Sequence, residues 1–545
     1  MSLAAFSEIL DKRRLLVLLI LFLVFLVLKW GMVYFNESNG FVIRYDGYIY
    51  LLKALEITKG DWAPIKTHAI GWPIFLAPFF YFFASPSIYE NMLWVTFLYI
   101  FTAGLVIFPL AYLSQKTLPG EKSWLLSLFL FIISDAFFKL PWLGFAEPLF
   151  TLFLLISICF IFKAKENPNY ILLAATFAGL SYWVKPQGLV SLIIVLLGFF
   201  FLKKMRPPLS WRYLVYIILL FFLIAAPFLY QRYIYFGSAF SYGENDKFLV
   251  DNYEQLWGKM FLSPTLTDFF SSGFFQKFFN KFFFYGLLQI LAFYILFIIS
   301  PVLLLFFFWG VLRNRDWPAV FLSWFLLIWL IIFIPVFAVL GTYRYLYHTL
   351  PVVIILATAG IIDFLKITGR KILLWLILLV FLGEAVVGTY YYLNYDLFNI
   401  FNQRKLFRDN FQWAREISQK IRGKLAIGTG ADLIMMNFPD TAVGGRGMFE
   451  LAAPLSGLSI IYPGLIPNLD SAMKWLKKNG VTHLAVDDNF LNETAWRRIN
   501  LLVYSGEEIP SYFQEVYSNR RPNPQWRIQV FKIDWDVYKS YTHKQ

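Results

Sequence analysis

The sequence predicts an α-helical polytopic membrane protein with about eleven transmembrane helices and a small α/β soluble domain at its C-terminus. Three observations lead to this fold class. The chain is 59% hydrophobic and only 15% charged, so an aqueous surface cannot cover most of it. Its apolar residues gather in blocks of roughly 17 to 25, the length that crosses about 30 Å of hydrocarbon as a helix. After Tyr392 these blocks stop, and ordinary soluble alternation begins.

The apolar blocks give the predicted order of the membrane segments. Helices are expected rather than strands, because an open sheet would leave backbone groups unpaired in lipid. The expected spans lie near residues 15–35, 89–113, 123–138, 148–163, 169–184, 188–202, 213–235, 282–312, 318–340, 346–365 and 372–393. The sequence therefore predicts two domains, a transmembrane domain over 1–393 and a soluble domain over 394–545.

The basic residues predict the orientation in the cell membrane. The net charge is +14, and lysine and arginine occupy every second connection, from Lys12–Arg14 before the first span to Arg370–Lys371 before the last. By the positive-inside rule these connections and the N-terminus are cytoplasmic. The remaining loops and the C-terminal domain are then extracytoplasmic. No soluble stretch combines basic residues with the pattern of a nucleic-acid site, so we expect no nucleic-acid partner.

The last 150 or so residues contain alternating strand and helix patterns. We expect strands over 424–430, 482–488 and 526–534, and a helix over 471–478 that Asp470 caps and Gly480 ends. The acidic pair 487–488 follows the second of these strands. It is either a ligand site at the end of a strand or an ordinary surface strand end.

The first predicted outward loop, at about 36–88, is long and contains two unusual segments. Residues 46–59 have the spacing of an amphipathic helix, which would lie in the membrane interface, and 69–83 are apolar but too short to cross the membrane. Asp46 stands where the loop meets the first segment. Partial desolvation would raise its proton affinity, as a general base requires, whereas the alternative is that Asp46 only caps the helix.

Other ionisable residues also lie in the predicted outward loops. His68, in the segment HAIGWP, is a candidate contact for a phosphate or sugar, although a lone histidine is more often structural. Asp135, Lys139 and Glu147 fall around one short turn, and charges so close to hydrocarbon tend to be functional. The alternative for Glu147, which precedes Pro148, is a solvated residue at a helix start.

Two further motifs suggest a site for an anion. Lys185 interrupts an apolar run in WVKPQG, where it either binds an anion or extends its amine to the interface. Arg344, Tyr347 and His348, in GTYRYLYHTLP, would share one helical face and could hold a phosphate through forked and neutral donors. An interfacial aromatic belt with an extended arginine is the alternative.

Several common chemistries have no motif in this sequence. It lacks a P-loop, GxSxG, HExxH and an outward DxD, and its single cysteine, Cys159, lies in a predicted span. An intramolecular disulfide and a cysteine metal site are therefore excluded. We predict no metal-binding residues, and a divalent cation is left as an open cofactor.

Taken in their order along the chain, these motifs resemble the GT-C superfamily of membrane glycosyltransferases. The similarity is to the branch of protein O-mannosyltransferases and the lipid A aminoarabinose transferase, and it covers about 1–393. It rests on RYDGYIYLLKALEITKGDW, HAIGWPIFLAP, AEPLFTLF, GLSYWVKPQGL, YFGSAFSYG and RYLYHTLP. Each motif is loose, and their order makes the resemblance specific.

The resemblance implies a glycosyltransferase that moves a hexose or pentose from a polyprenyl-phosphate donor to a hydroxyl of a lipid, glycan or protein on the outer face. It implies inversion at the anomeric carbon and matches Asp46 to the acidic residue of the first loop. We expect Asp46 and Glu147 in the catalytic machinery, and substrate contacts from His68, Lys139, Lys185, Arg344, Tyr347 and His348. A transporter or lipid flippase is the main alternative, and a non-catalytic anchor is a third. Transporters usually show repeated halves, which are not evident in this sequence.

Overall fold

A computed structural model describes the fold in parts. The described residues are 12–37, 45–64, 69–85, 88–138, 145–204, 209–237, 239, 286–293, 300–340, 343–394, 424–427, 459–461, 469–478, 480–487, 509–518 and 528–542. The chain forms two compact units, one of which contains Met1–Ser38, Val42–Ala84 and Asn91–Tyr395, and the other chiefly Asp396–Gln545. The functional division at residue 393 stays a prediction.

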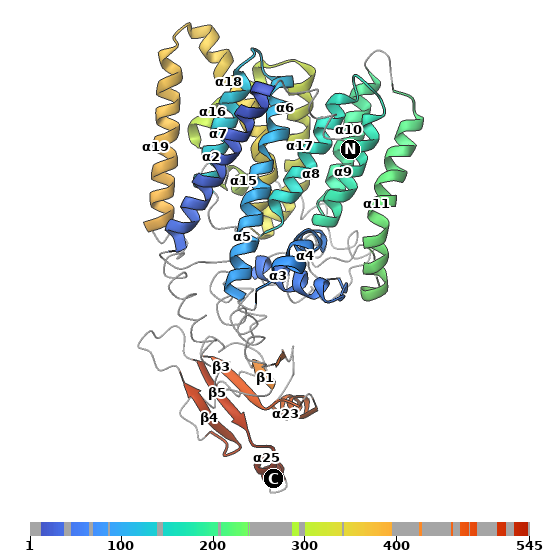
Figure 1. The fold of residues 1–545 in the computed structure, drawn as a ribbon, viewed down its shortest axis with the longest axis vertical. Coiled ribbons are helices and arrows are strands. Elements are labelled where there is room, and N and C mark those ends of the chain that lie inside the picture. Colours follow the sequence, from blue (N-terminus) through green and yellow to red (C-terminus); the bar gives the residue numbers. More distant parts are fainter. Residues whose placement is uncertain are drawn as a thin grey trace. The chain divides into compact units, whose positions relative to one another are not determined.

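The first unit is a bundle of apolar helices, as the sequence predicts (Figure 1). Its helices are α2 (Lys12–Glu37), α5 (Ile88–Leu105), α6 (Ile107–Thr117), α7 (Ser123–Phe138), α8 (Glu147–Lys163), α9 (Tyr170–Val184), α10 (Gly188–Lys203), α11 (Arg212–Phe236), α15 (Leu287–Phe293), α16 (Pro301–Arg313), α17 (Trp317–Leu340), α18 (Leu350–Thr368) and α19 (Ile372–Asn394). Each expected span overlaps at least one of these helices, and the expected spans 89–113 and 282–312 each overlap two. The helical membrane fold class is therefore confirmed.

Five helical segments of the described part are long and apolar enough to cross a membrane by length and composition. They are Lys12–Met32, Glu90–Thr117, Arg212–Tyr235, Trp317–Ile334 and Tyr345–Thr368. The first and third have mostly exposed surfaces, as expected of helices that face lipid, whereas the last is mostly buried among other helices. The chain is thus a multi-pass membrane protein.

Small residues bring two helices of this bundle into backbone contact. A Cβ atom added at Gly310 of α16 would lie 2.0 Å from the carbonyl oxygen of Leu356, and one at Gly360 of α18 would lie 2.0 Å from that of Phe306. Such an approach is typical of membrane helices, which gain van der Waals contact where side chains are absent. It fixes α18, whose N-terminal end carries part of the candidate site.

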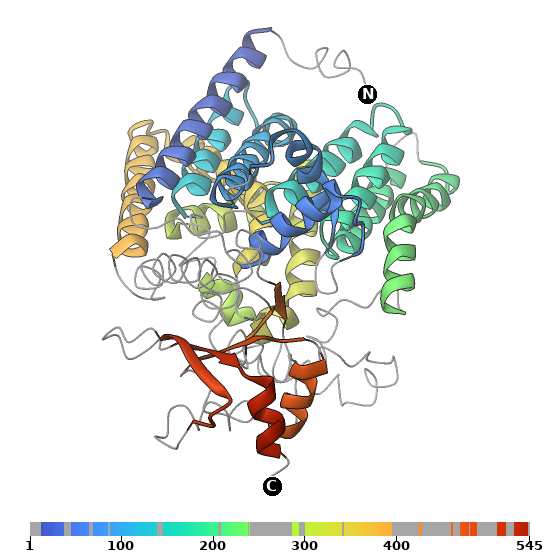
Figure 2. The same cartoon turned by 60° about the horizontal axis from the view of Figure 1, so that its bottom comes forward.

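Two shorter helices lie across one end of the bundle. They are α3 (Tyr45–Thr58) and α4 (Gly71–Phe83), which pack on each other (Figure 1). Figure 2, in which this end is turned toward the viewer, shows these two helices in front of the longer ones. Leu51 and Trp72 are fully buried, whereas Tyr81 and Phe82 are 70% and 74% exposed. The two predicted segments of the first loop are therefore helices, each with a buried and an exposed face.

The second unit contains a five-stranded mixed sheet. Its strands are β1 (Lys424–Ile427), β2 (Ser459–Ile461), β3 (His483–Asp487), β4 (Phe513–Ser518) and β5 (Ile528–Ile533), in the order β2-β1-β3-β5-β4. The β1 strand pairs with β2 and β3 in parallel, and β5 pairs antiparallel with β3 and β4. The three predicted strands and the α/β class are confirmed.

The predicted helix of this unit is also present, as α23 (Leu469–Lys478). It buries Met473 and Leu476, and the chain leaves it through Gly480 at a φ of +64°. A second helix, α25 (Trp535–Thr542), was not predicted; it is anchored by the Trp535 indole, which donates to the carbonyl of Val481 at 2.7 Å. Asp487 is the last residue of β3, and Asp488 lies outside the described residues.

Candidate active site

A buried ion pair joins two of the residues that the sequence singles out. The amine of Lys185 lies 2.6 Å from Oε1 of Glu147, and the two side chains are 9% and 3% exposed. Glu147 begins α8, with Pro148 in the first turn, whereas Lys185 lies in the break between α9 and α10. Glu147 is therefore not solvated, and Lys185 does not extend its amine to the interface. Both of those alternatives are wrong.

The break at Lys185 is held by close backbone packing. Its backbone is extended, with φ −152° and ψ 143°, and Gly188 restarts the helix beyond Pro186. A Cβ atom at Gly188 would lie 2.2 Å from the backbone nitrogen of Tyr182, so only glycine fits there. A Cβ atom at Gly71 would lie 2.5 Å from the backbone of Trp183. The start of α4 therefore packs beside the Lys185 break, which brings the HAIGWP and WVKPQG motifs together.

His348 reaches the same place from another part of the chain. It lies in a 3₁₀ helix, η5 (Tyr343–Thr349), which leads into α18, and its side chain is fully buried. Its Nδ1 is 2.8 Å from the hydroxyl oxygen of Thr151, and that hydroxyl donates to the carbonyl of Glu147. Because the single hydroxyl proton is used in this way, Nδ1 carries the hydrogen and donates to Thr151.

Aromatic side chains surround these polar groups. The ring of Phe150 lies 4.4 Å from that of His348, and Trp329 lies 5.6 Å from it between centroids. The amine of Lys185 lies 5.6 Å from the centre of the Tyr345 ring. Such contacts exclude water and strengthen electrostatic interactions within the site.

Tyr347, like its neighbour His348, belongs to η5, and it is 6% exposed. Its ring lies 5.9 Å from that of His348 between centroids. Residues 343–349 were expected to be α-helical, with Arg344, Tyr347 and His348 on one face. In a 3₁₀ helix, positions three apart coincide, so 344 and 347 share a face and 348 is turned about a third of a revolution away.

Asp135 belongs to a second buried pair, which the sequence interpretation missed. It lies in the last turn of α7, and its Oδ2 is 3.1 Å from the amine of Lys29 on α2. Both side chains are buried, at 1% and 0% exposure. The signal was present in the sequence, because a lysine inside a first span (LVLKWG) is costly without a partner.

The remaining candidates are only partly described. Asp46 is the second residue of α3, so it lies in the first turn of the helix and not at the cap, and Arg344 is in η5; the structure does not describe their side chains. His68 and Lys139 lie outside the described residues. Among the described residues, no three His, Cys, Asp or Glu side chains gather as metal ligands would.

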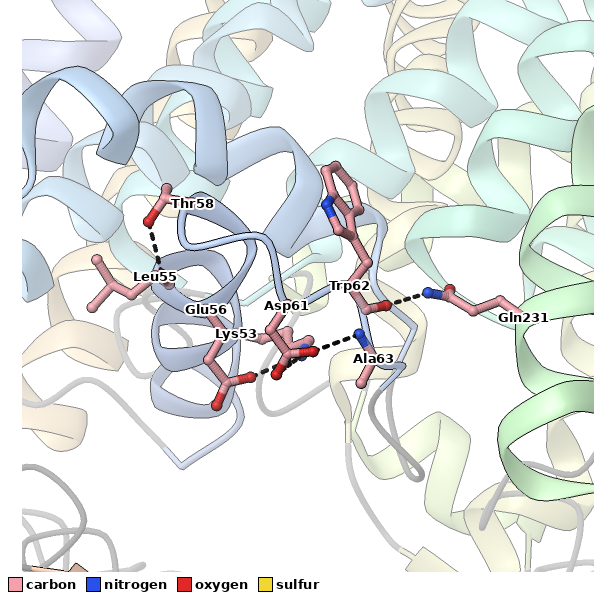
Figure 3. Close-up of polar contacts among 8 residues, drawn as sticks. All are labelled: Lys53, Leu55, Glu56, Thr58, Asp61, Trp62, Ala63 and Gln231. Carbon is pink, nitrogen blue, oxygen red and sulfur yellow. Dashed lines mark hydrogen bonds and ion pairs between the residues drawn. The ribbon is translucent and has the colours of Figure 1, made fainter.

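The connection that leaves α3 is held by polar contacts (Figure 3). Lys53, on α3, pairs with Glu56 at 2.8 Å and with Asp61 at 3.4 Å. The Asp61 carboxylate accepts the backbone N–H of Ala63, which lowers its pKa, and Lys53 adds to the effect. The Gln231 amide, on α11, donates to the carbonyl of Trp62. The loop that follows α3 is thus tied to the bundle.

These contacts define the site as a water-excluded cluster of charges at the end of the bundle where α3 and α4 lie. The Glu147–Lys185 and Lys29–Asp135 pairs each balance one positive and one negative charge, as buried charges require. The bundle with two short helices across one end agrees with the membrane fold that the sequence resemblance predicts.

Comparison with known proteins supports this fold. No protein-family model and no curated protein matches the chain. Among solved structures, it is similar to the oligosaccharyltransferase AglB of the archaeon Archaeoglobus fulgidus, in complex with an inhibitory peptide and a dolichol-phosphate. That similarity has a TM-score of 0.53 at 14% identity and covers 96% of this chain and 75% of AglB. A second structure, ArnT of Cupriavidus metallidurans bound to undecaprenyl phosphate, has a TM-score of 0.48 at 11% identity and covers 95% of this chain and 98% of ArnT.

Proposed function

We propose that this protein is a membrane glycosyltransferase that transfers a sugar from a polyprenyl-phosphate donor to an acceptor hydroxyl. The observation that carries the proposal is the buried Glu147–Lys185 pair, which Thr151 links to His348, at the end of the bundle where α3 and α4 lie. AglB, which has a similar fold, was solved in complex with a dolichol-phosphate. A helical bundle of this kind can therefore accommodate a lipid phosphate. The positive-inside pattern of the loops favours the extracytoplasmic face.

The proposed reaction is a direct displacement at the anomeric carbon. Asp46 removes the proton of the acceptor hydroxyl, whose oxygen forms the new bond while the bond to the lipid phosphate breaks. Attack from the face opposite the phosphate inverts the configuration. The carboxylate of Asp46 ends protonated, and the polyprenyl phosphate leaves with the electron pair of the broken bond.

The negative charge that develops on the leaving phosphate needs stabilisation. Because Glu147 already neutralises Lys185, the pair presents little net charge, and Arg344 is the main proposed cation. His348, Tyr347 and Lys185 then supply directed hydrogen-bond donors in a site shielded from water, with His68 and Lys139 as further contacts. In this scheme Glu147 orients the Lys185 amine toward the phosphate.

The proposed base is tested by transfer of labelled sugar from a panel of polyprenyl-phosphate sugars to a membrane extract. We expect purified wild type to label a product with at least one donor, and Asp46→Asn to lose at least about a hundredfold of that rate. Asp363→Asn is the matched control, because Asp363 pairs with Arg313 at an exposed site. Near-normal transfer by Asp46→Asn would show that Asp46 is not the base.

A folded wild type that transfers from no donor would favour the transporter alternative instead. Deletion of residues 395–545 tests a separate expectation, that the soluble domain selects the acceptor. We expect the truncated protein to lose discrimination among acceptors. An unchanged choice and rate would contradict that role.

A further inference from the structure

One lysine at the end of the bundle away from α3 and α4 forms no ion pair within the part of the chain that the structure describes. Lys163 is the last residue of α8 and is half-buried. The carboxylate of Glu166, which follows it closely in sequence, pairs with Lys116 at 3.1 Å instead. The Lys163 amine lies near two phenol rings, 5.8 Å from the centre of Tyr112 and 5.5 Å from that of Tyr170. Its charge is therefore not balanced by a directly paired carboxylate.

Two buried polar atoms lie on the side of α6 that carries the Tyr112 ring. They are the hydroxyl oxygen of Tyr112 and the side-chain nitrogen of Gln115, and neither has a hydrogen-bond partner among the described residues. Because the two residues are three positions apart, they share one face of the helix. A buried polar group without a partner carries a cost in free energy. Both atoms can donate a hydrogen bond, so this face is suited to a ligand that accepts hydrogen bonds.

Aromatic rings form a track on α8 and α9 that leads away from Lys163. The Phe160 ring stacks on Tyr170 at 5.9 Å and on Phe177 at 5.6 Å between centroids. Phe177 in turn contacts Phe153 at 5.9 Å. Phe153 and Phe177 are only half-buried, so they present ring surface on the outside of the bundle, where a membrane-spanning protein meets hydrocarbon. The Lys163 amine therefore lies at the end of an apolar surface, as the headgroup of a lipid does.

We propose that this part of the protein binds an anionic phospholipid, whose phosphodiester accepts hydrogen bonds from Lys163, Tyr112 and Gln115. The phosphate supplies the negative charge that pairs with the Lys163 amine, and its oxygens accept several hydrogen bonds at once. One acyl chain lies against Phe153 and Phe177. The charges of the loops predict that this end of the bundle is cytoplasmic, and the anionic lipids of that leaflet attract basic segments. The assignment does not depend on the proposed glycosyltransferase function.

Lipid binding can be measured on the full-length protein, purified in detergent and stripped of native lipid, by native mass spectrometry. The probes are 1-palmitoyl-2-oleoyl phosphatidylglycerol, which is anionic, and the phosphatidylcholine with the same acyl chains, which has no net charge. We expect the first phosphatidylglycerol to bind wild type at least about fivefold more tightly than the first phosphatidylcholine, because only the anionic lipid brings a net charge to the Lys163 amine. Equal affinities for the two lipids would overturn the proposal.

Substitutions place the binding at this face. Lys163→Gln should lower the affinity for phosphatidylglycerol about fivefold or more and remove the preference over phosphatidylcholine. Tyr112→Phe removes one hydroxyl and keeps the ring, and should lower the affinity about threefold to fivefold, so it tests the site even if Lys163→Gln does not fold. Lys366→Gln is the matched control, because Lys366 is an exposed lysine in the last turn of α18, and it should change the affinity less than about twofold. A folded Lys163→Gln or Tyr112→Phe with wild-type affinity would contradict the assignment.

Two further measurements separate a lipid from a soluble anion. A large excess of inorganic phosphate should leave the affinity for phosphatidylglycerol unchanged, whereas full displacement of the lipid by phosphate would show that the site takes a free anion. Phosphatidylglycerol with a diazirine in one acyl chain should cross-link to residues within 153–177 in wild type and much less in Lys163→Gln. The same cross-links at the same yield in both proteins would overturn the proposed position of the lipid.

Discussion

The two ends of the helical bundle use the same residue types in opposite ways. At one end the pairs Glu147–Lys185 and Lys29–Asp135 are almost completely buried. At the ends of α6 and α8 that lie away from this cluster, Lys116 and Glu166 pair at 3.1 Å but are 45% and 64% exposed. Exposed pairs contribute little and suit a solvated rim, whereas buried charges are expensive and mark functional sites. Burial, and not the number of charges, therefore distinguishes the candidate site.

The largest expected difference concerns stability. Lys185→Met leaves the Glu147 carboxylate buried without its cation, which should destabilise the fold by about 3 to 5 kcal/mol. Lys116→Met removes one partner of the exposed pair and should cost less than about 1 kcal/mol. Thermal unfolding of the two purified variants in the same detergent measures the difference. Equal shifts in Tm would show that burial does not separate the two ends.

The second effect tests the packing of α4 against the Lys185 break. A Cβ atom at Gly71 would lie 2.5 Å from the backbone of Trp183, which cannot move away as a flexible side chain would. We expect Gly71→Ala to destabilise the protein by about 1 to 3 kcal/mol and to lower transfer. The control is Gly383→Ala, since Gly383 has open space around it and alanine favours its helix. A neutral Gly71→Ala would contradict the contact.

A smaller effect is expected at the Thr151 hydroxyl. Thr151→Val removes the acceptor of the His348 Nδ1 hydrogen but keeps the side-chain shape, so transfer should fall about tenfold, as for a hydrogen bond of roughly 1.4 kcal/mol. Thr176→Val is the matched control, because Thr176 bonds only to the carbonyl of Leu172 among the contacts described for it. If both variants retained full activity, the Thr151 contact would have no part in orienting His348.

These comparisons show how much of the fold and of the candidate site the sequence predicts. The spans and the segment 69–83 were predictable because they are continuous apolar blocks, and the helix at 46–59 and strands β1, β3 and β5 because they have a local apolar pattern. The sequence also singled out Glu147, Lys185 and His348, since ionisable residues next to apolar runs are uncommon. It could not show that Glu147 and Lys185 pair, because that contact depends on how α8 packs against the α9–α10 break.

Other features lacked a usable local signal. Strand β2 has three residues, too short for an alternating pattern, and the 3₁₀ conformation of residues 343–349 depends on contacts with α8 and α17. The partner of Lys29 is 106 positions away along the chain, so its role is determined by tertiary packing alone.

The smallest expected effect lies in the soluble unit. Partial burial, and secondarily Lys532, lower the pKa of His483 below its ordinary value, so the folded state favours the neutral ring. As pH falls through about 6.5, the unfolded state binds more protons than the folded state. The free energy of unfolding therefore decreases at lower pH. Hydrogen exchange of residues 481–487 at pH 7.5 and 5.5 should show a larger loss of protection in wild type than in His483→Gln. An equal loss would exclude this histidine as the cause.

The central claim is that the buried charges serve sugar transfer and not only folding. The most direct test compares wild type with the double variant Glu147→Gln/Lys185→Met, which keeps the site neutral and approximately conserves its volume. We predict that the double variant unfolds within a few degrees of wild type but loses at least about a hundredfold in transfer from the polyprenyl-phosphate donor that wild type uses. A folded double variant with wild-type transfer would contradict the account.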